Sequence, residues 1–327
     1  MKCKQKNLIK DSTKCLHYRS SSDASAGLCS LPNEFRCIEA IENTAMKLSH
    51  SSLMNFLRCK RLYYYNNIKG LRVRPEMLSQ PLLMGGLYDK YMEMEYNTGK
   101  EIEIDKTNMT NVSIVKVKTI MRVIRDLELK PQLDGYISSQ FHFDCKLDDA
   151  LVQGYYDRKY SDHFVEMKFT GSPQYYNTAF EIQNQIGTYF LADEAMEYCI
   201  MEITVAPQLR LSKKSKKRLV DESPDEYYER VYEAILKQPS KYFIGLNRDK
   251  GTWGKKFYRK EFDLKAIKKR YECITTEIRE SAKRGWFYQN TTACNMFGGK
   301  CDYYDLCKSD GYVSEMIYTK RSKDNGK

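Results

Sequence analysis

The chain has 327 residues, of which 42% are hydrophobic and 30% charged, and Lys and Arg outnumber Asp and Glu by 54 to 43. At roughly 150 residues per domain, this length predicts one large or two modest domains with a substantial core, and the composition excludes a disordered polyelectrolyte. The formal net charge of +11 favours a polyanionic partner, with nucleic acid as the first candidate.

The N-terminal segment 1–45 mixes Ser, Asn, Lys and Cys without a sustained period, and residues 20–27 are typical of a flexible link. We expect a polar extension that could be disordered. The first residues are charged and lack the apolar region of a secretory signal, which predicts a cytoplasmic protein. No run approaches the roughly 18 apolar residues that a membrane span needs, so we expect no membrane partner.

Three helices are predicted in the next part of the chain. The first covers residues 48–68, because serines suited to an N-cap are followed by apolar residues at helical spacing. The second is expected over 82–96. The third is expected over 115–129, where Pro131 ends it, since proline cannot continue a helix.

A β-hairpin is predicted over 150–169, with a turn at 161–163. Side chains alternate along a strand, so Glu166 and Lys168 lie on one face of the second arm. Asp157 lies in the first arm, and the three side chains can converge at one end of a twisted sheet. Downstream we expect a long helix over 175–198, a strand over 201–207, a hairpin within 242–262, and helices over 225–238 and 263–284.

This mixture of helices and short strands predicts an α/β or α+β core rather than a sandwich or a helical bundle. The sequence contains no G-x-x-x-x-G-K-[ST] motif, which argues against a P-loop motor. Function must therefore be sought in side chains that the sheet brings together.

Asp157, Glu166 and Lys168 have the composition of a metal site with a cation beside it. Two carboxylates bind a hard divalent ion such as Mg²⁺, and the ion stabilises phosphoryl charge and lowers the pKa of bound water. Lys168 could orient that water or stabilise the transition state. The alternative is a surface hairpin with ordinary charges, and the short pattern D-x8-E-x-K alone leaves both interpretations open.

Two further pairs have helical spacing. Gln185 and Tyr189 are four residues apart on the helix that follows the hairpin, so they share a face. Gly85 and Asp89 are also four residues apart, on the predicted second helix. Both helices therefore present polar groups that could border the carboxylates.

Eleven cysteines in a chain without a secretory signal indicate metal ligation or free thiols, because the cytosol keeps structural disulfides rare. Cys294, Cys301 and Cys307 lie close together near the C-terminus, and this group has the spacing of ligands. The cysteines before residue 46 are irregularly spaced. Single cysteines in strand and helix patterns are expected to be small core residues, and these are Cys145, Cys199 and Cys273.

A basic run and a tyrosine run each allow two interpretations. Arg210–Arg218 holds six basic residues in nine and could contact DNA phosphates, with a solvated loop as the alternative. The consecutive tyrosines 63–65 could stack on unpaired bases, although aromatic residues in helices are more often part of the core.

Taken in chain order, several segments resemble the PD-(D/E)XK nuclease superfamily, in the RecB-like and AddB-like branch that includes CRISPR adaptation nucleases and many phage exonucleases. The resemblance covers about residues 48–307 and implies a restriction-endonuclease-like α/β fold, in which helices flank a mixed central sheet, with a C-terminal iron–sulfur segment. The matching segments are LSHSSLMNFLRCKRLYYY, MGGLYDKYME, GYYD with VEMK, QIGTY, and CNMFGGKCDYYDLC.

The same resemblance implies domain limits and residue roles. We expect a nuclease domain over 46–290, a cysteine-rich iron–sulfur segment over 291–310 and a tail over 311–327, after the 1–45 extension. Asp157 and Glu166 become ligands of Mg²⁺ or Mn²⁺, and Lys168 becomes the catalytic lysine. Two further residues, Gln185 and Tyr189, become part of the catalytic site, bordering the metal ligands and the DNA path.

One metal ligand departs from the family pattern. Asp89 stands where the family usually offers His, and the resemblance implies that it is the third ligand. Oxygen in place of imidazole should shift the preference toward harder ions. The alternative for Asp89 is a solvated helix face beside other charged residues.

The resemblance also implies a 4Fe-4S cluster, because this branch holds one with a cysteine before the nuclease core and three after it. Cys59, Cys294, Cys301 and Cys307 match that arrangement. Lys60 follows Cys59 where the family often has Pro. Zn²⁺ is the alternative cofactor, since four thiolates in tetrahedral geometry serve both.

The sequence therefore predicts a metal-dependent DNA exonuclease that hydrolyses phosphodiester bonds by attack of a metal-activated water, acting on DNA ends or single strands. One alternative is a catalytically silent nucleic-acid-binding module. Another is a structural subunit that assembles with recombination or CRISPR-adaptation proteins.

Overall fold

A computed structural model describes residues 46–98, 108–129, 134–178, 180–214, 220–309 and 316–320. It also describes two short strands, β1 (Tyr18–Arg19) and β2 (Leu28–Cys29), which pair with each other. The rest of the predicted extension 1–45 lies outside the described residues, as does most of the predicted tail. None of the described helices is long and apolar enough to cross a membrane.

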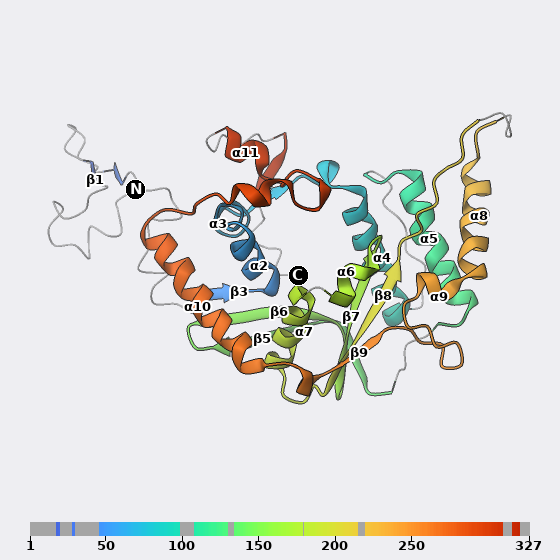
Figure 1. Ribbon diagram of the computed structural model, residues 1–327, viewed down its shortest axis with the longest axis horizontal. Helices are drawn as coiled ribbons and strands as arrows, with labels where there is room; N and C mark the ends of the chain where they lie inside the picture. The colour runs from blue at the N-terminus through green and yellow to red at the C-terminus, as the bar shows by residue number, and fades with distance from the viewer. Residues whose placement is uncertain are drawn as a thin grey trace. The chain divides into compact units, whose positions relative to one another are not determined.

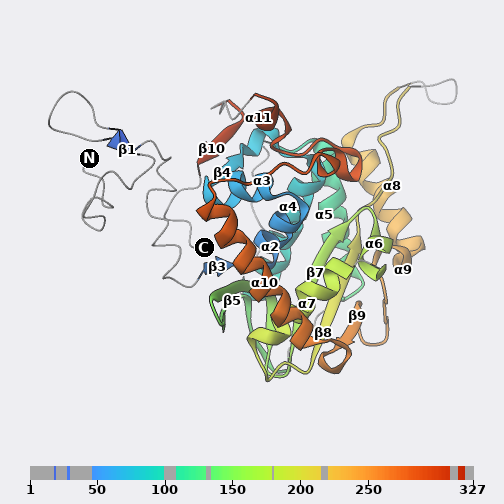
Figure 2. The same ribbon diagram turned by 60° about the vertical axis from the view of Figure 1, so that its left-hand side comes forward.

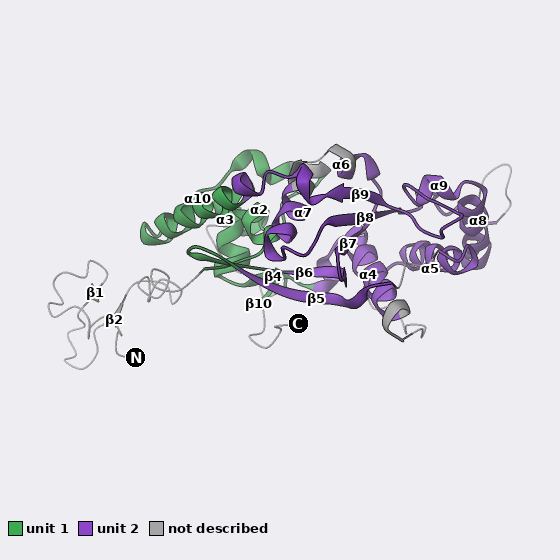
Figure 3. Cartoon of the chain, turned by 90° about the horizontal axis from the view of Figure 1, so that it is seen from below, with its two compact units in different colours: residues 1–74, 146–153, 268–327 green, residues 75–145, 154–267 purple. Residues whose placement is uncertain are grey.

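The chain folds into two compact units, each assembled from separate stretches of sequence (Figure 3). Unit 1 comprises Met1–Arg74, Lys146–Gln153 and Lys268–Lys327, and unit 2 comprises Pro75–Cys145 and Gly154–Ile267. The predicted carboxylate site lies in unit 2, and the predicted cysteine ligands lie in unit 1.

Unit 2 contains a mixed sheet, which confirms the predicted α/β class. The predicted hairpin is present as antiparallel strands β6 (Ala150–Tyr160) and β7 (His163–Thr170). Strand β8 (Tyr198–Val205) runs parallel to β7, and β9 (Lys255–Tyr258) runs antiparallel to β8. Most of β5 (Tyr136–Leu147) also belongs to unit 2, and β5 pairs with β6.

Helices cover both faces of this sheet because successive strand residues point to opposite sides. Met167 packs with helices α4, α5 and α8, and α5 lies beside α8 (Figure 1). Phe164 packs on the other side with α7, which lies across the strands (Figure 2). The helices of unit 2 are α4 (Gln80–Thr98), α5 (Asn111–Asp126), α6 (Pro173–Thr178), α7 (Phe180–Ala192), α8 (Pro224–Lys237) and α9 (Pro239–Tyr242), with 3-10 turns η5 (Pro75–Met77) and η6 (Arg259–Glu261).

Unit 1 is built around short elements. Strand β3 (Met46–Leu48) pairs in parallel with the first residues of β6, and β4 (Leu71–Val73) pairs antiparallel with β10 (Tyr318–Lys320). The 20-residue helix α10 (Leu264–Lys283) lies mostly in this unit. The remaining elements are α2 (His50–Arg58), α3 (Lys60–Tyr63), the π-helix η4 (Tyr64–Ile68), the 3-10 helix η7 (Thr291–Gly298) and α11 (Tyr304–Lys308).

The first predicted helix differs from the structure. Residues 48–68 form a strand end and three short helical segments, because Cys59 adopts an extended conformation with φ −160° and ψ 118°. Ser49 and Ser52 cap α2 reciprocally, which fixes its start two residues after the strand. The Cys59 sulfur accepts a hydrogen bond from the Asn290 backbone at 3.3 Å, so a contact distant in sequence accompanies the break.

Other differences also come from tertiary contacts. The long helix predicted over 175–198 ends at Ala192, where Arg259 donates to the carbonyl oxygens of Phe190 at 2.6 Å and Asp193 at 3.0 Å. These are carbonyls that a helix end leaves without a helical partner. The hairpin predicted within 242–262 contributes one strand, β9, which pairs with β8. Strand β5 was not predicted.

Exposure confirms the core interpretation for two of the consecutive tyrosines and corrects the expectation for two of the single cysteines. Tyr63 and Tyr65 are each 5% exposed and pack in the core, so they offer no stacking platform. Cys199 is buried as predicted, whereas Cys145 is half-buried and Cys273 is exposed. The helix α10 places Cys273 on its solvent face, which its sequence period alone did not reveal. The basic run 210–218 lies partly outside the described residues.

Candidate active site

The β6–β7 hairpin positions the two central carboxylates. The strands pair at Arg158 with Val165 and at Lys159 with Phe164. At the next step, the backbone N–H of Met167 donates to Asp157 Oδ2 at 2.7 Å. The carboxylate thus accepts a backbone hydrogen bond between the strands, which fixes it beside the second arm.

Glu166 is the most buried acid of this group, at 3% exposure. Its Oε1 accepts hydrogen bonds from Lys168 Nζ and from Gln185 Nε2, the latter at 2.8 Å. Its Oε2 is buried and has no hydrogen-bond partner among the described residues. A buried carboxylate oxygen without a donor is costly, so this atom is suited to a positively charged or hydrogen-bonding ligand.

Helix α7 supplies the second layer of polar groups. Gln185 and Tyr189 lie one turn apart, and Gln185 Nε2 is 3.0 Å from the Tyr189 hydroxyl oxygen. The shared helix face predicted for this pair is therefore present. Gln185 links Tyr189 to Glu166, and this holds the orientation of the carboxylate.

The charges of the site act strongly on one another. Burial raises the pKa of Glu166 to about 7, opposed by Lys168 and assisted by the charge of Asp157. Burial also raises the pKa of Asp157, and Lys168 opposes that rise. Burial alone would lower the pKa of Lys168, but the charges of Glu166 and Asp157 raise it above its usual value. The lysine therefore retains its proton at neutral pH.

Asp89 lies near this group on α4. Desolvation by the surrounding protein raises its pKa to about 7, the charge of Asp157 adds to that rise, and Lys168 opposes it. The residue as a whole remains exposed to solvent. The structure thus brings Asp89 within electrostatic reach of Asp157 and Lys168.

These oxygen donors have the chemistry that Mg²⁺ and Mn²⁺ prefer. Within the described ranges, however, no three His, Cys, Asp or Glu side chains are already gathered into a group that could hold a metal ion. The unpartnered Oε2 of Glu166 and the raised carboxyl pKa values indicate where a cation would be favourable. By donor type and electrostatics the residues fit a divalent ion.

Gln140 joins the site although the sequence reasoning missed it. Its Nε2 lies 3.4 Å from Asp157 Oδ1, on the opposite side of the carboxylate from Met167. Its φ of 49° lies in the left-handed region, which a non-glycine residue rarely adopts. The alternation of apolar and polar residues over 136–147 is the signal that could have revealed strand β5 and hence Gln140.

The four predicted cysteine ligands are among the described residues and all lie in unit 1, and they too are not already gathered into a group that could hold a metal ion. We call Cys59, Cys294, Cys301 and Cys307 the thiol cluster. Burial raises the pKa of Cys307 to about 11, and the charges of Cys59, Cys301 and Cys294 add to that rise. Cys307 therefore lies within electrostatic reach of the other three thiols.

Backbone contacts hold the thiol cluster together. Asn290 donates its N–H to Cys59 Sγ at 3.3 Å and its side-chain amide to the Arg58 carbonyl at 2.9 Å. The Cys301 N–H donates to the Cys294 carbonyl at 2.8 Å. These contacts tie the segment after α10 to the break between α2 and α3.

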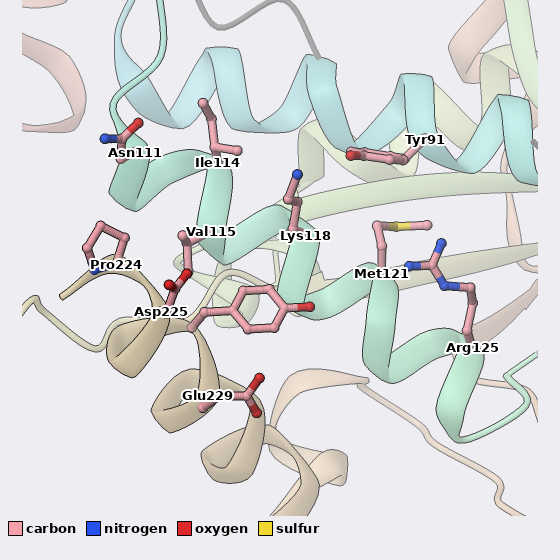
Figure 4. A pocket seen from close by; sticks show the side chains of 11 residues that line it. Tyr91, Asn111, Ile114, Val115, Lys118, Met121, Arg125, Pro224, Asp225 and Glu229 are labelled. Carbon is pink, nitrogen blue, oxygen red and sulfur yellow. The ribbon is translucent and has the colours of Figure 1, made fainter. Parts of the chain in front are cut away.

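A cavity of about 600 Å³ lies elsewhere in unit 2, among α4, α5 and α8 (Figure 4). Its charged lining has both signs, with Lys118 and Arg125 from α5 and Asp225 and Glu229 from α8. None of the predicted site residues lines it.

No family model and no curated protein matches this chain. A solved structure with some similarity is described as “Putative exonuclease” from Eubacterium rectale. The two chains are 15% identical with a TM-score of 0.37, and the match covers 71% of this chain and 91% of the other. Similarity at this level carries no conclusion about function, for which the geometry of the site itself must provide the argument.

Proposed function

We propose that this chain is a metal-dependent deoxyribonuclease of the PD-(D/E)XK type, acting as an exonuclease on DNA ends or single strands. The observation that carries the proposal is the state of Glu166. It is buried beside Asp157, held through one oxygen by Lys168 and Gln185, and its other oxygen has no partner in the described part of the chain.

Asp157 and Glu166, with Asp89 as the third ligand, would hold Mg²⁺ or Mn²⁺. When bound, the ion would supply Lewis acidity, neutralising phosphoryl charge and lowering the pKa of water. The raised pKa values of Glu166 and Asp89 support this assignment, because a nearby divalent charge would favour their ionised forms.

Lys168 would act on the substrate as a fixed positive charge. Its pKa is raised by the two acids, so it stays an ammonium and can stabilise charge that develops on a phosphate oxygen. Gln185 positions Glu166 through the 2.8 Å hydrogen bond and leaves Oε2 available. Tyr189 in turn positions Gln185.

We also propose that the thiol cluster holds a 4Fe-4S cluster, with Zn²⁺ as the alternative. Thiolates suit both, and Cys307 lies within electrostatic reach of the other three thiols. A bound metal cation would stabilise the thiolate form of Cys307, which burial disfavours. The role would be structural, fastening the C-terminal segment to the break at Cys59.

Two alternative functions are a silent nucleic-acid-binding module and a structural subunit for recombination or CRISPR-adaptation proteins. The ordered contacts of Glu166 and Lys168 favour an enzyme, since binding DNA does not need buried acids. The test uses the full chain, purified without oxygen, with end-labelled single- and double-stranded DNA and Mg²⁺ or Mn²⁺. Mononucleotide release that stops in Lys168→Ala supports the exonuclease; a wild type that binds DNA without cutting it refutes the enzyme.

A further inference from the structure

A second cavity of unit 2, of about 270 Å³, lies on the sheet face opposite Glu166. Val165 and Ile200 line it from β7 and β8, and both pack with the α4 side of the sheet, whereas Phe164 and Met201 pack with α7. Residues of the loop from Gly245 to Gly254 also line the cavity. This volume is near the lower limit for small-molecule sites.

The buried end of the cavity carries one acceptor and one donor. Glu202 is 5% exposed, and its Oε2 accepts from Arg158, which leaves Oε1 of the same carboxylate outside that ion pair. Trp253 is 3% exposed, and its indole Nε1 has no hydrogen-bond partner among the described residues. A buried indole N–H without an acceptor is costly, so a ligand atom that accepts this hydrogen would be stabilising.

Tyr160 and His163 line one side of the cavity and belong to an aromatic stack. His163 lies between Tyr160 and Tyr198, with ring centroids 4.2 Å and 4.6 Å away and interplanar angles of 12° and 7°. Its Nδ1 is 2.7 Å from Asp162 Oδ1, which fixes the ring. Both faces of the His163 ring are therefore covered, so this side of the cavity is held in place and His163 presents a ring edge to it.

The open end is basic. Lys250 and Lys256 line the rim and are exposed, and Lys256 Nζ lies 4.2 Å from the centroid of the Tyr198 ring. The rim loop is well ordered by two backbone hydrogen bonds between Asn247 and Thr252, at 2.7 Å and 3.1 Å. Two exposed lysines at this end favour an anionic group there.

We propose that this cavity binds a nucleoside monophosphate, with its base at Glu202 and Trp253 and its phosphate at Lys250 and Lys256. Every nucleobase presents an N–H donor next to an acceptor on its edge, which matches the carboxylate of Glu202 and the unpartnered indole N–H of Trp253. The phosphate matches the basic rim. The assignment goes beyond the proposed nuclease, although a nuclease that releases single nucleotides would generate this class of ligand.

The chain contains two tryptophans, and this permits a direct measurement. Trp286 is 62% exposed and lies in unit 1, so Trp286→Phe leaves Trp253 as the sole indole fluorophore. The full-length variant is titrated in EDTA with dGMP, dAMP, dCMP or dTMP, and in parallel with deoxyribose 5-phosphate and inorganic phosphate. We expect a saturable emission change with the nucleotides, and at least tenfold weaker binding of the two base-free phosphates.

Substitutions then separate the two ends of the cavity. Lys250→Gln with Lys256→Gln should weaken nucleotide binding at least fivefold and leave binding of the uncharged nucleosides unchanged, whereas Lys255→Gln, an exposed neighbour outside the cavity, should change neither. Trp253→Phe, followed by calorimetry, should weaken binding of nucleotides and nucleosides alike. Glu202→Gln is less decisive because it breaks the buried pair with Arg158.

Three results would overturn the proposal. These are no emission change at millimolar nucleotide, equal affinity for nucleotide and inorganic phosphate, or loss of nucleotide binding in Lys168→Ala. The last result would place the nucleotide at the nuclease site instead. Conversely, nucleotide binding that survives in Lys168→Ala supports the second site even if the chain cuts no DNA.

Discussion

The carboxylate site of unit 2 and the thiol cluster of unit 1 are assembled in different ways. Glu166 and Lys168 are two residues apart on one strand and compensate each other's charge through a direct hydrogen bond. The thiol cluster comprises Cys59 and three cysteines near the other end of the sequence, and burial raises the pKa of Cys301 and Cys307, with the neighbouring thiols adding to that rise. The first group is balanced by a lysine within it, whereas around Cys307 the charge of Arg61 opposes the rise in pKa without cancelling it.

This difference indicates what a bound cation would contribute in each region. In unit 2, removal of a divalent ion should leave the fold intact, since Lys168 and Gln185 still satisfy one oxygen of Glu166. In unit 1, Cys59 and Cys294 both contact the backbone of Asn290, so the thiols connect segments that are distant in sequence. A metal centre should therefore contribute to folding in unit 1 and to chemistry in unit 2.

The largest expected effect is on cleavage. Lys168→Ala and Glu166→Ala should each lower the rate by about 10²–10³-fold or more, because they remove charge that acts on the transition state. DNA affinity, measured by fluorescence anisotropy, should change little. Lys255→Ala and Glu194→Gln serve as controls, since both residues are exposed and lie outside the site. Retained cleavage in either site variant would refute the assigned centre.

The next effect concerns the thiol cluster. Anaerobically purified protein should be brown and contain about four irons per chain, and Ala at any of the four cysteines should remove the colour and lower the melting temperature. Cys273→Ala is the matched control because Cys273 is exposed on α10. Zinc in place of iron would refute the iron–sulfur assignment but would still support a structural metal site at the four cysteines. Absence of any metal would refute both.

A smaller effect is expected at Asp89, which remains partly open to solvent. Asp89→Ala should raise the Mg²⁺ concentration needed for half-maximal cleavage by about tenfold, a loss typical of a single ligand or its supporting group. Asp89→His should retain cleavage and shift the preference toward Mn²⁺. Lys90→Ala, at the exposed neighbouring position, should leave the metal titration unchanged. An unchanged metal titration in Asp89→Ala would show that Asp89 is a solvated residue on the helix face and not a metal ligand.

The smallest expected effect is on the pH dependence of the free energy of unfolding. It concerns His163, a buried residue outside both regions. Burial lowers the pKa of His163, so the unfolded chain binds a proton more readily below about pH 6.5, its ordinary value. The free energy of unfolding should therefore fall as pH falls from 7 to 5, and His163→Phe should lessen that fall. Urea denaturation at several pH values measures it, with the exposed His142→Phe as control. Equal slopes in wild type and His163→Phe would contradict the assignment.

The sequence alone determined the features that depend on local periodicity. The hairpin over 150–169 and the shared face of Glu166 and Lys168 follow from the two-residue period of a strand, and the pairing of Gln185 with Tyr189 follows from the helical period. The helices predicted near α5 and α8 are also present, and α8 begins with a complete capping box at Ser223. These signals lie within a few residues, so no distant contact was needed to read them.

Features that depend on contacts between distant residues could be read only from the tertiary structure. Asn290 contacts the extended Cys59, and Arg259 donates a hydrogen bond to a carbonyl group at the end of α7. Neither Asn290 nor Arg259 lies within the segment that it contacts. Gln140 reaches Asp157 through a left-handed backbone conformation that no sequence period encodes. The cavity around Trp253 likewise forms because a distant loop folds over the sheet. Such features arise when packing and hydrogen bonding outweigh the weak local preferences of the chain.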